Sequence, residues 1–154
     1  MNATVGSIED RMLKLQLRLA QLEKNELAQN NFLHFVHAMW PEFISGRHHK
    51  IIAEKLQRVA SGELKRLIIN MAPRHTKSEF ASFLFPAWMM GRNPGMKIIQ
   101  ATHTTELAVN FGRKTKNLID SDEYKAVFPS HDRFGLFKLN CKKLGEHSGV
   151  ELNQ

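Results

Sequence analysis

A lysine followed by a serine, Lys77 and Ser78, stands at the expected start of a helix, soon after a short apolar run. A lysine amine is a point charge suited to phosphate oxygens, and a serine hydroxyl is a ligand for Mg²⁺. Arg74 adds a planar cation that stays charged at physiological pH. Backbone N–H groups at a helix N-terminus also hold anions. This combination predicts a site for the phosphates of a nucleotide bound with Mg²⁺.

The stretch departs from the phosphate-binding pattern G-x-x-x-x-G-K-[ST] at both glycines. Met71 and Thr76 occupy the glycine positions, whereas Lys77 and Ser78 match. Thr76 lacks the freedom of glycine at positive φ, so the loop has to be shaped differently or strained. The alternative is a basic turn that only caps a helix. An expected strand before the loop, a helix after it and Pro73 at its entry favour the phosphate site.

Two apolar runs predict strands, Arg66–Asn70 and Lys97–Thr102. Continuous apolar runs are typical of strands buried on both faces of a parallel sheet. The helix from about Lys77 contains Pro86, which has to kink or interrupt it. A further helix follows Thr104 or Thr105. The order strand, loop, helix, strand, helix predicts an α/β fold: a partial P-loop NTPase βαβ unit with a parallel sheet, a right-handed crossover and preceding helices.

The first helix is expected from Ile8 to about Ala28, capped by Ser7. Apolar residues follow an alternating spacing of four and three along it: Ile8, Met12, Leu15, Leu19 and Leu22, with Leu13 and Leu17 broadening the face. Two heptads are short for an independent coiled coil, which favours a helix packed on its own domain. A docking helix for a partner subunit is the alternative.

Two more helices are expected before the loop. Asn30 or Asn31 caps a helix from Phe32 to Trp40, which Pro41 stops. The next begins after Gly46 and ends at Gly62.

Composition sets broad limits. The chain has 154 residues, with 22 Lys and Arg against 15 Asp and Glu, and this surplus attracts polyanions such as DNA. It is spread along the sequence and does not by itself identify a nucleic-acid partner. The single cysteine, Cys141, excludes an internal disulfide and fits a reducing cytosol. We expect no membrane span and no secretory signal, because the chain lacks the apolar runs that both require.

Several unusual motifs occur together in the stretch from Phe32 to Pro129. The segments are Pro73-Arg74-His75-Thr76-Lys77-Ser78, Phe85-Pro86-Ala87-Trp88, Gly91-Arg92-Asn93-Pro94 and Thr102-His103. In order and spacing this stretch resembles the N-terminal ATPase region of the large terminase subunit of tailed bacteriophages. The resemblance implies a partial ATPase domain at residues 30–129. The apolar spacing before it predicts an amphipathic helix at residues 1–29, and the resemblance stops at a divergent tail, residues 130–154, which is expected to be disordered.

The resemblance also implies site residues and cofactors, namely ATP and Mg²⁺. Lys77 and Ser78 become the phosphate and Mg²⁺ residues, and Arg74 becomes a catalytic arginine that stabilises the γ-phosphate. The expected nucleotide contacts run through Pro73, Arg74, His75, Thr76, Lys77, Ser78 and Glu79. His49 is a candidate adenine contact; the alternative is a polar residue at a helix N-terminus.

Family members hydrolyse ATP to drive viral DNA into a capsid. The implied partners are double-stranded phage DNA, the portal protein, the small terminase subunit and further copies in a homo-oligomeric ring. The implied location is the host cytoplasm, transiently at the procapsid portal.

Parts of the family pattern are absent from this sequence. No acidic pair follows a third apolar strand, and "LIDSDE" at Leu118–Glu123 is expected to be a solvated helix end. The nuclease domain is also missing, so we expect the chain alone to be catalytically incomplete and its tail to arise from a frameshift, stop or interruption. Alternatives are a non-catalytic terminase remnant that binds nucleotide or docks on partners, and an unrelated basic DNA-binding protein.

The remaining candidates have ordinary structural explanations. His34 and His37 are a possible metal pair without a third ligand, and Cys141 and His147 lack partners at zinc spacing. Trp40 and Trp88 are expected in the core. Arg113, Lys114 and Lys116 are expected on a solvated basic face, with DNA or a neighbouring subunit as the alternative. "FKLNC" at 137–141 is a weak third strand.

Overall fold

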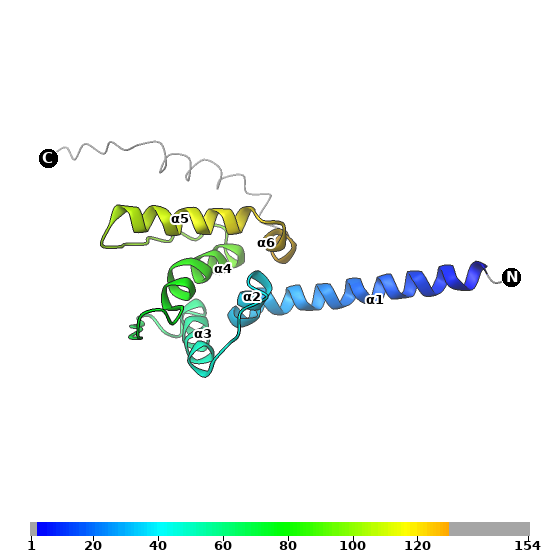
Figure 1. Cartoon of the computed structure of the whole chain (residues 1–154), viewed down its shortest axis with the longest axis horizontal. Helices are drawn as coiled ribbons and strands as arrows, with labels where there is room; N and C mark the ends of the chain where they lie inside the picture. The colour runs from blue at the N-terminus through cyan, green and yellow to red at the C-terminus, as the bar shows by residue number, and fades with distance from the viewer. Residues whose placement is uncertain (1–2, 130–154) are drawn as a thin grey trace.

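The computed structural model describes residues 3–129, which are built from helices joined by loops and extended segments (Figure 1). The elements are α1 (Ala3–Asn30), α2 (Phe32–Met39), α3 (Arg47–Ala60), the π-helix η1 (Glu79–Leu84), α4 (Phe85–Arg92), α5 (Thr105–Asp120) and α6 (Asp122–Val127). No helix of this described part is long and apolar enough to cross a bilayer. The predictions about the tail, the 137–141 strand, Cys141 and His147 lie outside the described residues.

The predicted parallel sheet is wrong, and with it the α/β P-loop βαβ class, because the described chain contains helices and no strand. Segment 66–70 is extended but packs through one side only. Leu67 and Ile69 lie against the core, while Ile68 is 89% exposed. In segment 97–102, Ile99 is 95% exposed. Both segments have the composition of strands, but neither has a strand beside it, so neither is covered on two faces.

The predicted helix boundaries that follow α1 are largely confirmed. The Asn31 side chain accepts from the N–H groups of Leu33 and His34 and caps α2. Thr104 caps α5 by accepting from Leu107 N–H. Such side-chain oxygens satisfy amides that have no partner inside the helix. α2 also ends just before Pro41, as its sequence predicted.

The core is an aromatic cluster where α2, η1, α4 and α6 meet. Its fully buried rings are Phe32, Phe35, Phe80, Trp88 and Tyr124. Phe32 packs edge-on against Phe80, with centroids 5.6 Å apart. Trp88 donates from Nε1 to the Ala28 carbonyl at 2.9 Å, and Tyr124 donates from its hydroxyl to the Ala87 carbonyl at 2.7 Å. Trp40, also expected in the core, is 37% exposed.

The π-helix lies directly before Pro86. A proline has no N–H to donate and its ring crowds the preceding turn, so the helix has to adjust there. Here the adjustment is the wider π turn over Glu79–Leu84, after which α4 continues the helical run. The predicted interruption at Pro86 is therefore confirmed in position.

Within residues 3–129, only the C-terminal end of α1 contacts the body. Asn25 Nδ2 donates to the Ala126 carbonyl at 2.9 Å, and the Gln29 amide donates to the Val127 carbonyl. Toward its N-terminus the helix projects clear of the other elements (Figure 1). The expectation that it packs on its own domain is wrong, because Ile8 to Leu22 remain more than half exposed at their apolar positions. The helix also begins earlier than predicted, at Ala3 rather than after Ser7.

Candidate functional site

The loop before η1 adopts a conformation that most residues avoid. Arg74 has φ 64° and Thr76 has φ 56°, the two positive values found at non-glycine positions in the described residues. Left-handed backbone costs an L-residue roughly 1–2 kcal/mol, so the surroundings have to hold it. Thr76 stands where the phosphate-binding pattern has glycine. The loop is thus built as the sequence required: strained, without the glycine.

A chain of hydrogen bonds from α3 holds Thr76. Gly46 N–H donates to Nδ1 of His49 at 2.9 Å, and Nε2 of His49 lies 2.7 Å from Thr76 Oγ1. Since Nδ1 accepts, the hydrogen of the neutral ring is on Nε2 and is donated to Thr76. The Thr76 hydroxyl in turn donates to the His75 carbonyl at 2.7 Å. His49 therefore positions the loop.

His49 is held from the side of the core as well. It is 7% exposed and stacks on Phe80, with ring centroids 5.4 Å apart. Burial lowers the pKa of His49, and the neighbouring imidazoles of His48 and His75 lower it further. The neutral ring is the form that the hydrogen bond from Gly46 requires. The predicted adenine contact stays a prediction, whereas the link to Thr76 is a structural role that the sequence reading did not include.

The residues predicted to bind phosphate line one open hollow of about 500 Å³, formed by residues 72–79. Lys77 is partly buried, and its amine donates to the Met71 carbonyl at 3.3 Å. Ser78 is exposed at the first helical turn. Amides in such a turn have no acceptor inside the helix. The ammonium, the hydroxyl and these amides together suit a phosphate with its Mg²⁺.

The other predicted loop residues are less central. Arg74 and Pro73 are exposed, and His75 Nδ1 lies 2.8 Å from the Pro73 carbonyl, which closes the turn. Glu79 pairs with Lys114 of α5 at 3.0 Å. Glu79 lines the hollow while its carboxylate is engaged in this ion pair, and its predicted nucleotide contact stays a prediction.

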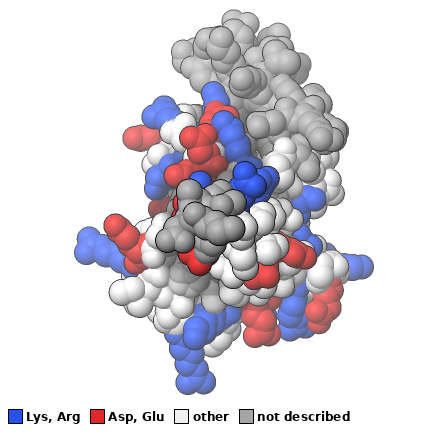
Figure 2. Space-filling view, turned by 90° about the vertical axis from the view of Figure 1, so that its right-hand side faces the viewer, with Lys and Arg blue, Asp and Glu red and all other residues white. Residues whose placement is uncertain are grey.

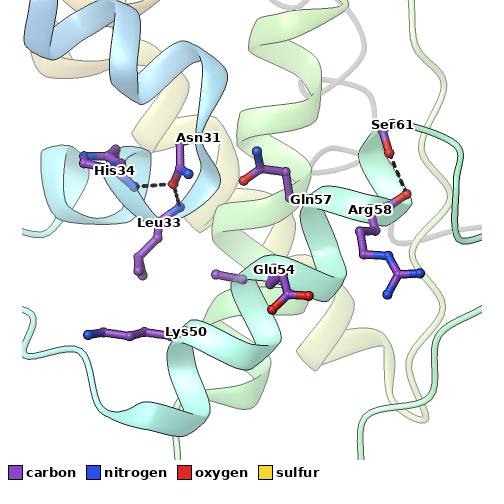
Figure 3. A pocket seen from close by; sticks show the side chains of 9 residues that line it. Asn31, Leu33, His34, Lys50, Glu54, Gln57, Arg58 and Ser61 are labelled. Atoms are coloured by element: carbon purple, nitrogen blue, oxygen red, sulfur yellow. Dashed lines mark hydrogen bonds between the residues drawn. The ribbon is translucent and has the colours of Figure 1, made fainter.

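A second hollow, of about 490 Å³, lies between α2 and α3 (Figure 3). Lys50, Glu54 and Arg58 are among its lining residues. Arg58 bonds Glu63 at 2.8 Å. Gln57 reaches the Asn30 carbonyl and accepts from Phe32 N–H. Arg58 and Gln57 of this hollow thus have structural partners. The Thr76 loop combines a cation, a hydroxyl and a helix start in a way that this surface does not.

The remaining sequence candidates do not form a second site in the described part. Residues 3–129 bring together no group of three or more His, Cys, Asp or Glu suited to a metal, so His34 and His37 gain no third ligand there. "LIDSDE" spans the junction where α5 ends at Asp120 and α6 begins at Asp122, with Ser121 as cap. The acidic residues of that junction are exposed at a helix end, as predicted.

Basic and acidic side chains are interspersed on the face of the molecule shown in Figure 2. The positive surplus is therefore not gathered into one patch on that face. Arg113 lies on the exposed side of α5, and Lys114 is engaged with Glu79. This arrangement agrees with the solvated basic face expected for α5.

One sequence signal could have located the first of the two contacts of His49, the bond to the start of its own helix. His49 is the third residue of α3, where a Glu or Gln side chain commonly bonds back to the residue that starts the helix. His49 does this through Nδ1, which leaves Nε2 directed elsewhere. Its second partner is 27 residues away, and no local pattern encodes that distance.

No family model, no curated protein and no solved structure matches this chain.

Proposed function

We propose that this chain binds Mg-ATP through the 72–79 loop, as the ATP-binding part of a viral DNA-packaging motor of the terminase type. The observation that carries the proposal is the strained loop itself. Arg74 and Thr76 are held at positive φ directly before Lys77 and Ser78, at the start of a helical run. Strain of this kind is concentrated at functional sites.

The terminase assignment rests on the sequence motifs around that loop. With it come the partners of such a motor: double-stranded phage DNA, the portal protein, the small terminase subunit and other copies of the full-length protein in a ring. The corresponding location is the host cytoplasm and the procapsid portal. DNA binding by this chain alone is a separate claim, which a filter-binding measurement at two salt concentrations would address.

In this proposal each loop residue has a distinct role. The Lys77 amine leaves the Met71 carbonyl for the β- and γ-phosphates, and Ser78 supplies a hydroxyl to Mg²⁺. Arg74, exposed and always charged, reaches the γ-phosphate. Mg²⁺, when bound, neutralises charge on the phosphate oxygens.

Thermal unfolding with and without Mg-ATP tests the proposal. A ligand at a hundred times its dissociation constant stabilises the folded state by about 2.7 kcal/mol. Lys77→Ala removes a charge-assisted contact worth about 1.5–3 kcal/mol and should abolish most of the shift. Lys50→Ala, on the hollow between α2 and α3, is the matched control and should keep it. Equal shifts for wild type and Lys77→Ala would refute the proposal.

Binding without turnover is the second candidate function, and the position of Glu79 favours it. Among the described residues that line the hollow, Glu79 is the one carboxylate, and its partner is Lys114. A general base typically contributes 10²–10⁴-fold to a rate. We therefore expect the pure chain to bind ATP and to release phosphate far below motor rates. A phosphate-release assay at saturating ATP measures this, and steady turnover would exclude the non-catalytic alternative.

A further inference from the structure

The projecting part of α1 exposes a continuous apolar line. The α1 seam consists of Ile8, Met12, Leu15, Leu19 and Leu22, whose side chains are 55–62% exposed. At 3.6 residues per turn, the alternating spacing of four and three keeps these side chains on one side of the helix. Fully burying a leucine is worth about 1.5–3 kcal/mol, so an exposed line of five apolar residues needs an explanation.

The part of the body that the structure describes does not cover this seam. The hydrogen bonds that join α1 to the body are made by Asn25, Ala28, Gln29 and Asn30, near the C-terminal end of the helix. The seam residues lie on the stretch that stands clear in Figure 1. A partner therefore has access to the seam without any change in the fold of the described residues.

We propose that a second copy of this chain covers the seam, in a parallel two-stranded coiled coil formed by the two α1 helices. Met12 and Leu19 then occupy a positions, and Ile8, Leu15 and Leu22 occupy d positions. In the sequence Val5 stands at the preceding a position, which extends the pattern by one layer. The a and d side chains of each helix pack into the spaces between those of the other.

Charged residues beside the seam favour pairing with a second copy of α1 and favour the parallel over the antiparallel orientation. Arg18 falls at a g position and Glu23 at the following e position, so in a parallel pair each Arg18 faces Glu23 of the other copy, twice by symmetry. In an antiparallel pair g faces g, which would bring Arg11 opposite Arg18. The sequence of α1 is thus complementary to itself in parallel and repulsive in the opposite direction.

Sedimentation velocity of the full chain over a range of concentrations tests self-association. We expect a monomer–dimer equilibrium. Leu15→Gln, which removes one seam side chain from each helix, should weaken dimerisation by roughly a hundredfold. Leu17→Gln is the matched control, because Leu17 is 63% exposed and Leu15 is 62% exposed on the same helix, but Leu17 lies off the seam. A monomer at every concentration, a higher oligomer, or equal loss in both variants would overturn the proposal.

The direction of the pair is tested by charge reversal. Arg18→Glu places two acidic side chains together in a parallel dimer and should weaken it roughly tenfold at low salt. The double variant Arg18→Glu with Glu23→Arg should recover wild-type dimerisation. In an antiparallel dimer Arg18→Glu would instead relieve repulsion with Arg11 and strengthen association, and that result would overturn the parallel arrangement. Neither outcome depends on nucleotide binding.

Discussion

The aromatic core and the 72–79 loop meet at Phe80, but they are stabilised in different ways. Phe80 is fully buried and touches Phe32, Phe43 and His49, with ring centroids 5.4–5.6 Å apart. A few residues before it, Thr76 is held at positive φ mainly by one side chain from α3. Each core side chain is held in place by several packing contacts, whereas the conformation of the loop depends on single hydrogen bonds. Substitutions in the core should therefore lower the free energy of unfolding. Substitutions that relieve strain in the loop should raise the free energy of unfolding and weaken the binding of Mg-ATP.

The largest effect is expected at Trp88. Its ring is fully buried and its Nε1 bonds the Ala28 carbonyl, so Trp88→Ala leaves both a cavity and an unpaired acceptor. We expect a loss of about 3–5 kcal/mol in the free energy of unfolding. Trp40→Ala, at a tryptophan that is 37% exposed, is the control and should cost much less. Chemical denaturation measures both, and similar losses would contradict the assignment of the core.

Alanine substitutions at Gly91 and Gly112 compare the effect of an added Cβ at a closely packed position and at an open one. A Cβ at Gly91 of α4 would lie 2.5 Å from Cδ2 of Phe128, so Gly91→Ala forces a buried ring to move. We expect a loss of about 1–3 kcal/mol. A Cβ at Gly112 of α5 meets nothing within 4 Å, so Gly112→Ala should instead stabilise by about 0.5–1 kcal/mol. Melting changes of the same sign for the two variants would show that Phe128 does not pack closely on α4.

The difference between core and loop also explains what the sequence could predict. Asn31, Thr104 and Pro41 fix the ends of the helices next to them, and these helix ends follow from the neighbouring sequence alone. The two expected strands failed because an apolar run such as Arg66–Asn70 does not encode which segment lies beside it. A strand is defined by a partner far away in the chain, and the described residues provide none.

The candidate site was predictable in part for the same reason. Lys77 and Ser78 at a helix start follow from local sequence, and the cost of Thr76 at a glycine position follows from sterics. The surface that covers the apolar residues of α1 could not be predicted, because its heptads fit packing on its own domain as well as packing on a partner. Only the structure shows that the apolar positions from Ile8 to Leu22 are not packed on the described body of the protein.

Acid should weaken the loop before the core, through His49. Its pKa is lowered in the folded protein, chiefly by burial, so the unfolded chain binds the proton more readily. Stability from this group is fully present above about pH 6.5, the ordinary value, and is lost as the pH falls toward the lowered pKa. His49→Gln should flatten the pH dependence of melting between pH 7.5 and 5. His34→Gln, on α2, should leave it unchanged, and identical profiles for His49→Gln and wild type would contradict the role of His49.

The smallest expected effect on stability is at Arg74 in the 72–79 loop. There a substitution should stabilise the protein, whereas Trp88→Ala in the core should destabilise it. Arg74 is exposed at φ 64°, where glycine is unstrained. Arg74→Gly should raise the free energy of unfolding by about 0.5–1 kcal/mol, since relief of the left-handed strain outweighs the added freedom of the unfolded chain. Arg74→Ala removes the guanidinium but keeps the strain, and should not stabilise. Both variants should bind Mg-ATP more weakly than wild type, as measured by titration calorimetry.

Stabilisation by glycine together with weaker binding would mean that the arginine is kept at this position for its charge. If Arg74→Gly instead destabilised the free protein, the loop would be a structural turn, and its resemblance to a phosphate site would be one of sequence only.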